Sequence, residues 1–373
     1  MPRSLLILVF CTLMVSACTT RSPGIGGPVE WSSLQNWTAD KQSDVWGGFL
    51  KSCQKLRQQQ WQEVCQLAKN SGDLSDAEAR EFFETNFEVR PVYAEGGITE
   101  GLITGYYEPL LKGSWERSEE FRYPLYGVPE DLLIVDLGRI YPQLKNLRLR
   151  GKLVGNRVVP YYDRGQLDDD QDLLQGREIL WVNSLVDVFF LHVQGSGRIQ
   201  LEDGSTVAVG YAGQNGHPYQ SIGRVLAEMG ELEKEEITLF TIKDWLRSNP
   251  SRLNEVLARN PSYIFFELRD AEANGPVGAL NVALTPRRSI AVDRNVIPLG
   301  APVWLQTTLP DAQQSPLNQL MLAQDTGGAI KGHVRADVFW GRGDEAEKMA
   351  GLMKQQGKLF VLLPRGYSIE KKQ

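Results

Sequence analysis

The chain has 373 residues, of which 42% are hydrophobic and 23% are charged, a composition typical of a globular protein. This length allows two or three domains, or one large domain that carries an insertion. The formal net charge is −6 and the sequence has no long run of basic residues, which argues against a nucleic-acid-binding protein.

Residues 1–17 have the pattern of an export signal. Their apolar run, Leu5 to Val15, is too short to span a bilayer as a helix. Val15-Ser16-Ala17-Cys18 resembles a bacterial lipobox, so we predict cleavage before Cys18 and acylation of its thiol. An ordinary signal peptide followed by an incidental cysteine is the alternative. The residue after the cysteine is Thr19 and not aspartate, which in Gram-negative lipoproteins implies passage to the outer membrane. We therefore predict a lipid anchor on the periplasmic face of the outer membrane.

Residues 18–33 are rich in Thr, Ser, Gly and Pro and are predicted to form a flexible tether. Helical spacing of apolar residues follows from Ala39 to about Phe87. The third helix of this segment is expected to begin at a capping box, Ser75-Asp-Ala-Glu78.

Two cysteines, Cys53 and Cys65, lie within the helical segment, and export permits a disulfide between them. On one straight helix their separation would be roughly 18 Å, which is too long for a disulfide. A bond therefore requires a break in the helix near residues 57–60. Two reduced cysteines in the core are the alternative.

The middle of the chain consists of short apolar runs separated by turn signals, which is the pattern of an all-β region. Predicted strands fall at 98–111, 132–135, 153–154, 158–161, 179–182, 186–193 and 207–211. The acidic residues 167–172 are expected to form a solvated loop or the start of a helix. Helical periodicity is found at residues 220–229 and in a helix that Thr241 would cap.

The C-terminal third returns to strands. They are predicted at 264–268, 281–286, 289–293, 302–305 and 359–363. An amphipathic helix is expected from Glu345 to Gln356, with Gly357 as its C-terminal stop. The whole chain is therefore predicted to be mainly β with flanking helices.

The stretch from Met321 to Gly341 holds two acidic residues in contrasting settings. Asp325 precedes Thr326-Gly-Gly328, where two glycines allow a sharp turn. Asp337 lies in a short apolar run that predicts a strand, where desolvation would raise the pKa of its carboxyl group. A carboxylic acid that keeps its proton near neutral pH can act as a general acid. The alternative is a pair of turn-capping aspartates.

Other kinds of chemistry have little support. The three histidines are isolated and no cysteine–histidine pair has the spacing of metal ligands, so we expect neither a metal nor another cofactor. The sequence also lacks a phosphate-binding loop and a Gly-x-Ser-x-Gly elbow. Carboxylates near Tyr, Trp, Gln and Asn point to glycosidic bonds, because sugar rings stack on aromatic side chains and sugar hydroxyls pair with amides.

Several motifs, in one consistent order, resemble a known family. Residues 325–337, with Asp293 upstream, resemble the 3D domain, which is named for three aspartates. Three further segments resemble signatures of the membrane-bound lytic murein transglycosylase A family: Gly105-Tyr-Tyr-Glu-Pro109, His192-Val-Gln-Gly-Ser-Gly197 and Pro218-Tyr-Gln-Ser-Ile-Gly223. The similarity extends from about Leu34 to the C-terminus, and the lipobox agrees with it.

The resemblance implies a two-domain fold. A double-psi β-barrel domain, with the N-terminal helices, would comprise residues 34–112 and 268–373. A second β-rich domain, residues 113–267, would be inserted into it, with the substrate groove between the two.

The resemblance also implies non-hydrolytic cleavage of the β-1,4 bond between N-acetylmuramic acid and N-acetylglucosamine in peptidoglycan. Asp337 would act as the single acid and base and would leave a 1,6-anhydromuramyl end, unlike the usual scheme with two carboxylates. Asp325 would lie close by and tune or position Asp337. This sequence has one more residue between the two aspartates than we expect of the enterobacterial form.

Further positions that match the family motifs would line the groove. They are Thr104, Tyr106, Tyr107, Gln194, Gly195, Ser196, Lys331 and Asp293. Asp293 is also readily explained as a turn residue. The implied partners are peptidoglycan glycan strands and, through the lipid anchor, a membrane; a murein synthase is a candidate protein partner. Exo- or endo-action, glycan length and the role of peptide stems are left open.

Two rival functions remain at this point. A hydrolase would use Asp325 and Asp337 with water and would yield reducing ends. A non-catalytic lipoprotein would bind peptidoglycan through the same groove.

Overall fold

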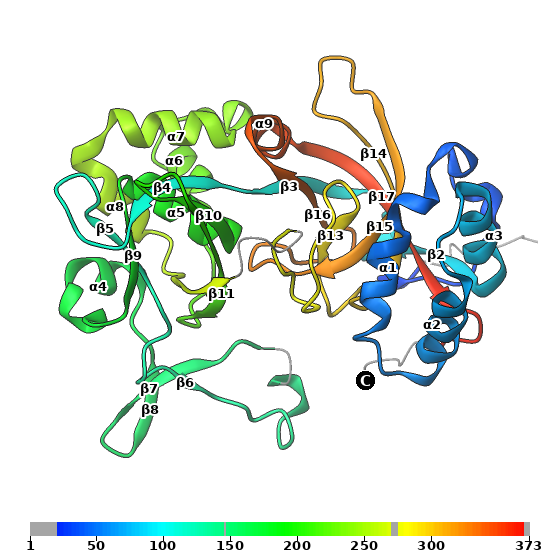
Figure 1. Ribbon diagram of the computed structural model, residues 1–373, viewed down its shortest axis with the longest axis horizontal. Coiled ribbons are helices and arrows are strands. Elements are labelled where there is room, and N and C mark those ends of the chain that lie inside the picture. Colours follow the sequence, from blue (N-terminus) through cyan, green and yellow to red (C-terminus); the bar gives the residue numbers. More distant parts are fainter. Residues whose placement is uncertain (1–20, 145–146, 270–274, 369–373) are drawn as a thin grey trace, which may run out of the picture.

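The computed structural model describes residues 21–144, 147–269 and 275–368. The predicted signal peptide and the lipidation site Cys18 lie outside the described residues. Figure 1 shows two lobes side by side, with strand β3 (Gly101–Glu108) running from one towards the other. Within the described part of the chain, no helix has both the length and the apolar character that a membrane span requires.

Three helices form the outer end of the first lobe: α1 (Trp46–Cys53), α2 (Gln59–Ser71) and α3 (Asp76–Asn86). The predicted capping box at Ser75 is confirmed, because its hydroxyl accepts the backbone N–H of Glu78 while the Glu78 carboxylate accepts that of Ser75. Aromatic rings of α1 and α3 pack against each other, Phe49 on Phe83 at 5.5 Å between centroids. Short 3-10 helices precede them: η1 (Trp31–Ser33), η2 (Trp37–Ala39) and η3 (Gln42–Val45).

Six of the described strands close into a barrel. Around the ring they follow the order β17 (Lys354–Pro364), β14 (Pro302–Thr308), β15 (Pro316–Asp325), β13 (Ser289–Val292), β16 (Ala336–Arg342) and β3. The ring closes because β3 also pairs with β17, which leaves these strands without a free edge. Strands β2 (Phe87–Tyr93) and β1 (Gly24–Ile25) extend the sheet beyond β17. The fold is thus a β-rich barrel with helices, as predicted; the double-psi crossing of its strands stays a prediction.

The second lobe is built on a six-stranded sheet. Its order is β12 (Ile264–Arg269), β11 (Thr206–Gln214), β10 (Ser196–Gln200), β4 (Leu110–Ser114), β9 (Glu178–Val182) and β5 (Tyr123–Tyr126). The predicted division at residue 112 falls inside β4, and all five residues of that strand pair with this sheet. A smaller sheet of β6 (Leu133–Ile134), β7 (Arg150–Val154) and β8 (Arg157–Pro160) projects from the lobe (Figure 1).

Helices pack around the second sheet and join the two lobes. They are α4 (Arg164–Asp169), α5 (Leu185–Gln194), α6 (Ile222–Glu228), α7 (Leu239–Ser248) and α8 (Leu253–Ala258). Shorter 3-10 helices are η4 (Glu95–Gly97), η5 (Pro142–Leu144), η6 (Gln171–Leu174), η7 (Lys234–Glu236) and η8 (Pro250–Arg252). Helix α9 (Asp344–Leu352) of the barrel lies beside α7, and Lys243 on α7 binds Glu347 on α9 at 2.7 Å.

The prediction of a strand at 186–193 was wrong, because these residues form helix α5. A continuous apolar run has no alternation that would distinguish a strand from a buried helix. Six residues of α5 are buried, so most of the run packs into the core, although Val193 is exposed. The boundaries were set by residues outside the run: the Ser184 hydroxyl caps the first turn, and Gly195 ends the helix with a left-handed conformation, φ 78°.

Three smaller predictions were also wrong. The predicted helix 345–356 ends at Leu352, because the residues after it pair with β3 and close the barrel. Gly357 is therefore part of a strand and not a helix stop. Thr241 is the third residue of α7, whose cap is Thr238. Residues 281–286 form turns and not a strand, apart from an isolated bridge between Ala283 and Val277.

The acidic segment 167–172 contains the end of α4 and the start of η6, which agrees with the expected start of a helix, but Leu167 within it is buried. Its apolar side chain anchors α4 in a cluster with Tyr161 and Phe265.

A disulfide joins Cys53 to Cys65, with 5.3 Å between their Cα atoms. The alternative of two reduced thiols is thereby excluded. The bond is possible because α1 ends at Cys53 and α2 begins at Gln59, so the helical segment breaks where the distance argument required. The disulfide therefore fixes α2 against α1.

Removal of this disulfide should lower stability. For a loop closed by a sequence separation of 12 residues, chain entropy predicts a loss of about 3 kcal/mol in the free energy of unfolding. Denaturant unfolding of the variant that carries both Cys53→Ala and Cys65→Ala, compared with wild type, measures this loss. Reductant should destabilise the wild type and leave the double variant unchanged; equal stability of the two oxidised proteins would contradict the prediction.

Candidate active site

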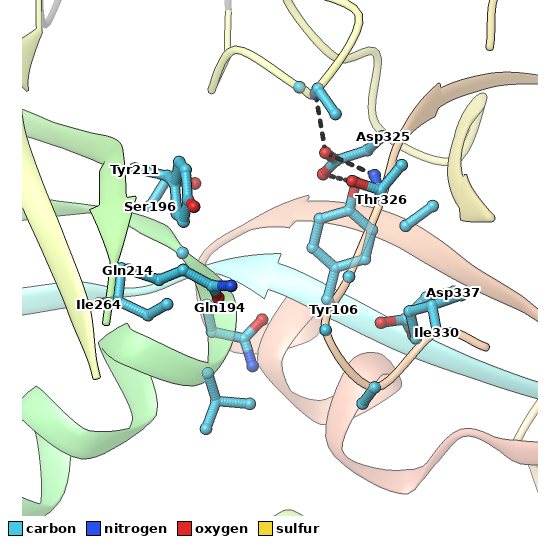
Figure 2. A pocket seen from close by; sticks show the side chains of 18 of the residues that line it. Tyr106, Gln194, Ser196, Tyr211, Gln214, Ile264, Asp325, Thr326, Ile330 and Asp337 are labelled. Carbon is cyan, nitrogen blue, oxygen red and sulfur yellow. Dashed lines mark hydrogen bonds between the residues drawn. The ribbon is translucent and has the colours of Figure 1, made fainter. Parts of the chain in front are cut away.

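A cavity of about 500 Å³ lies between the two lobes, and both lobes contribute to its walls. Figure 2 shows Asp325, Tyr106 and Asp337 on the side of the barrel. Gln194, Ser196, Tyr211, Gln214 and Ile264 face them from the second lobe. The two predicted acids thus lie in one cavity, opposite polar and aromatic side chains.

The register of the barrel strands brings the two aspartates together. Ala291 on β13 is the partner of Asp325 on β15 and of Asp337 on β16. On the far side of β16, Asp337 is paired with Thr104 on β3. These four residues therefore form one row across four adjacent strands, and the Cα atoms of the two aspartates are about 10 Å apart, two strand spacings.

Among the described residues, the Asp337 carboxyl group accepts a side-chain hydrogen bond from one uncharged donor. The Thr104 hydroxyl donates to Asp337 Oδ1 at 2.5 Å, and Thr104 in turn accepts Arg335 Nη2 at 2.9 Å. Burial raises the pKa of Asp337; Arg335 and the Thr104 hydrogen bond act in the opposite direction, and the Asp325 charge raises the pKa further. The net direction is upward, which favours a protonated carboxyl group.

Asp325 is fixed by three donors on its two carboxylate oxygens. The backbone N–H groups of Ala279 and Thr326 donate to Oδ1 at 2.9 and 2.8 Å, and the Tyr106 hydroxyl donates to Oδ2 at 2.9 Å. Burial raises the pKa of Asp325; these hydrogen bonds and the charge of Arg148 oppose the rise, but the net direction is upward, as it is for Asp337. Burial and the Asp325 charge raise the pKa of Tyr106 well above its usual value, so the phenol keeps the proton that it donates.

Gln194, Gly195 and Ser196 form the corner where helix α5 turns into β10. The Gln194 carbonyl accepts the backbone N–H of Tyr107 at 3.0 Å, a contact between α5 and the barrel strand β3. This bond fixes the side chain and orients its amide, whose NH₂ group is then the donor available to a ligand. All three residues line the cavity, as their motif implied.

The structure places four of the predicted binding residues outside the cavity lining. The Tyr107 hydroxyl donates to Glu347 at 2.8 Å and lines a separate cavity of about 350 Å³. Asp293 accepts hydrogen bonds from the backbone N–H groups of Asn295 and Gly332 at 3.0 and 3.1 Å, as a residue that stabilises a turn does. Lys331 is exposed. Thr104 also lies outside the lining, but it acts on the site through Asp337.

Other lining residues were not singled out from the sequence. They include Arg148, Tyr211, Gln214, Tyr219, Arg269 and Arg294. Tyr219 belongs to the Pro-Tyr-x-Ser-Ile-Gly motif and could have been named from it. Arg148 precedes β7 in a segment without any motif, so only the tertiary structure reveals it.

His192 shows that a motif residue can be structural. Its ring is buried, and Nδ1 accepts Arg164 Nη2 at 2.8 Å. Burial, reinforced by Arg164, lowers the pKa of His192 well below its usual value, so the imidazole is neutral. Among the described residues, no group of three or more His, Cys, Asp or Glu side chains is arranged to hold a metal ion.

Comparisons with known proteins agree along the chain. Residues 102–267 match the family described as the MltA specific insert domain, and residues 288–363 match the 3D domain. A membrane-bound lytic murein transglycosylase A from Vibrio cholerae is 31% identical over 344 residues, which cover 90% of this chain and 83% of the relative.

Solved structures are similar over nearly the whole chain. MltA from Neisseria gonorrhoeae is 37% identical with a TM-score of 0.78, covering 95% of this chain and 98% of that one. Escherichia coli MltA with bound chitohexaose is 25% identical with a TM-score of 0.66, covering 92% and 95%. On these similarities, the chain belongs to the membrane-bound lytic murein transglycosylase A family.

Proposed function

We propose that this protein is a lytic transglycosylase of peptidoglycan that uses Asp337 as its single acid and base. It cleaves the β-1,4 bond between N-acetylmuramic acid and N-acetylglucosamine and leaves a 1,6-anhydromuramyl end. The observation that carries the proposal is the unequal setting of two carboxyl groups in one cavity between the lobes.

The hydrogen-bond partners support different roles for the two aspartates. Asp325 accepts three hydrogen bonds, which stabilise its anionic form and leave little freedom to move a proton. Among the described residues, Asp337 accepts a side-chain hydrogen bond from Thr104 alone, and its pKa is raised by burial, with the negative charge of Asp325 nearby. Because the pKa of both carboxyl groups is raised, the choice of Asp337 as the proton donor rests on its having fewer hydrogen-bond donors than Asp325 to stabilise its anion.

The proposed step needs no group beyond Asp337 and the substrate. The Asp337 proton passes to the glycosidic oxygen while the bond from that oxygen to muramyl C1 breaks. The C6 hydroxyl of the same sugar then bonds to C1, and its proton passes to the Asp337 carboxylate. The enzyme ends in its starting form, and neither water nor an enzyme nucleophile is consumed.

A glycan ligand suits the opposite wall of the cavity. Tyr211 and Tyr219 provide aromatic rings for sugars, and Gln194 offers an amide to hydroxyl or acetamido groups. The relative from Escherichia coli was solved with bound chitohexaose, a chain of the same β-1,4-linked sugar type. Both facts support a groove that follows a glycan strand.

We further propose a place and a domain division for the protein. The relatives are named membrane-bound, and the lipobox ending at Cys18 would supply acyl chains that hold the protein at the periplasmic face of the outer membrane. A murein synthase stays a candidate partner. The barrel domain would comprise residues 24–109 and 270–373. It would begin at β1, which pairs with β2 and lies within the segment 18–33 predicted as a tether; β4 and β12 both pair within the second sheet, which then belongs to the inserted domain.

Replacement of Asp337 should abolish turnover. In Asp337→Asn the side chain keeps its size but has no proton of suitable acidity, so the rate should fall by at least about a hundredfold. Mass spectrometry of muropeptides released from purified murein sacculi measures it, with Asp203→Asn in an exposed turn as the matched control. Anhydro-ended products from wild type and the control alone are expected. Reducing-end products would indicate a hydrolase, and binding without release by any of the three would indicate a non-catalytic lipoprotein.

The pH dependence should respond to Thr104. Activity requires protonated Asp337 and should fall as the pH rises through its raised pKa. The Thr104 hydroxyl stabilises the Asp337 anion, so Thr104→Val should raise this pKa further and move the basic limb of the rate profile to higher pH. Thr104→Ser keeps the hydroxyl and should keep the wild-type profile. A shift of the Thr104→Val limb to lower pH, or none, would contradict the role assigned to Asp337.

Gln194 should matter through its amide NH₂ group. Gln194→Glu keeps an acceptor for the buried Tyr107 N–H but loses the donor, so chitohexaose should bind more weakly, by about 1 kcal/mol, with little change in melting temperature. Gln194→Ala also removes the acceptor and should lower the melting temperature as well. Calorimetric titration and thermal unfolding separate the two effects, and wild-type affinity in Gln194→Glu would remove Gln194 from the binding site.

A further inference from the structure

Three arginines line the same cavity as the two aspartates. Arg148 lies in the connection from η5 to β7, Arg269 ends β12, and Arg294 follows β13. They come from segments far apart in the sequence and from both lobes. These three guanidinium groups lie in one cavity with the two carboxyl groups of Asp325 and Asp337, although the chain as a whole has a formal net charge of −6. The cavity therefore contains positive charge beside its two acids, in a chain whose formal net charge is negative.

Arg148 is held at the junction of the lobes. Its Nη2 donates to Thr326 Oγ1 at 3.3 Å, next to Asp325. Its guanidinium lies 5.9 Å from the ring centroid of Tyr211, a residue on the opposite wall. The side chain is half-buried, and the threonine hydroxyl leaves most of its donors unused. The guanidinium is near enough to Asp325 for its charge to lower the pKa of that carboxyl group, but no ion pair joins these two described residues.

The other two arginines differ in their pairing. Arg269 forms an ion pair with Glu267 on the same strand. Among the described residues, neither Arg148 nor Arg294 forms an ion pair with a carboxylate. Arg294 is exposed and approaches the cavity from the barrel, so Arg148 and Arg294 offer free positive charge from the two sides.

The proposed substrate has negative charge at regular intervals. Every N-acetylmuramic acid carries a lactyl group on its C3 oxygen. In bare strands the lactyl group ends in a carboxylate, and in intact strands it carries a peptide stem with carboxylates of its own. A glycan made of N-acetylglucosamine alone, such as chitohexaose, has no such charge. Arginine is well suited to carboxylates because its planar fork can donate two parallel hydrogen bonds.

We propose that Arg148 and Arg294 form a carboxylate-binding subsite that recognises the acidic substituents of muramyl residues beside the cleavage position. The inference rests on the proposed function, which supplies the class of substrate. It adds the contact that would distinguish peptidoglycan, with its carboxylates, from a neutral β-1,4 glycan. The subsite attracts the anionic strand into the cavity of a protein that is otherwise acidic, and it selects which sugar lies next to Asp337.

Equilibrium binding tests the subsite without turnover. The full chain with Asp337→Asn serves as the parent, and Arg148→Gln or Arg294→Gln is added to it. Three ligands of equal sugar number are titrated: chitohexaose, a bare hexasaccharide of alternating N-acetylglucosamine and N-acetylmuramic acid, and the same hexasaccharide with peptide stems. Arg57→Gln, an exposed arginine in the connection from α1 to α2 and outside the cavity lining, is the matched control.

Each cavity variant should bind the charged ligands roughly three- to tenfold more weakly and chitohexaose with the affinity of the parent. The difference should shrink as salt is raised, because screening weakens a charge pair that is open to solvent. Loss with the bare hexasaccharide alone assigns the subsite to the lactyl carboxylate, which is an uncharged amide in the peptide-bearing ligand. Loss with the peptide-bearing ligand alone assigns it to the stem carboxylates, and loss with both shows that the subsite accepts either kind of carboxylate.

Equal loss with all three ligands, or no loss with either charged ligand, would overturn the subsite. The readout is affinity in a background that lacks the proposed acid, so a failure of the Asp337 mechanism leaves this test intact. Failure of the parent to bind any of the three ligands would instead refute the glycan substrate itself, and the subsite with it.

Discussion

The position of β13 between β15 and β16 is the constraint on which the site depends. One residue, Ala291, is the register partner of Asp325 on one side and of Asp337 on the other. Because side chains alternate between the two faces of a strand, a slip of one residue in β16 would turn Asp337 to the other face. Closure of the barrel by β17 and β3 fixes this register, since no strand of the ring has an edge along which to slide.

The second lobe completes the site through contacts with the strand that leaves the barrel. Tyr107 on β3 donates its backbone N–H to the Gln194 side chain and so orients the Gln194 amide on the facing wall. Tyr107 directly follows Tyr106, which lines the site on the barrel side. A second link lies behind the cavity, where buried Lys243 on α7 binds Glu347 on α9 at 2.7 Å and Tyr107 donates to the same carboxylate at 2.8 Å. These contacts hold α5 and α7 against the barrel.

Charge is distributed so that one cavity can hold both an acid and an anionic polymer. Burial favours the protonated form of Asp337, whereas three donors stabilise the charge of Asp325. Arginines at the rim lie beside these groups without an ion pair to either aspartate in the described part of the chain. Proton transfer at the centre and recognition of charge at the rim can thus be served by different residues.

The sequence by itself determined the features that depend on neighbours in the chain. The capping box at Ser75 and the grouping of Asp325 and Asp337 around two glycines can both be recognised in consecutive residues, whereas the break between Cys53 and Cys65 was only a condition for a disulfide until the structure showed the bond. The family motifs then placed Gln194 and Tyr106 in one groove, although 88 positions separate them. Tertiary structure alone decided the rest: that 186–193 is a helix, that 354–357 closes the barrel, that Tyr107 points away from the site and that Arg148 enters it. An apolar run looks the same in a buried helix and in a buried strand, and a solitary arginine has no local pattern, so these outcomes depend on packing between segments that the sequence leaves far apart.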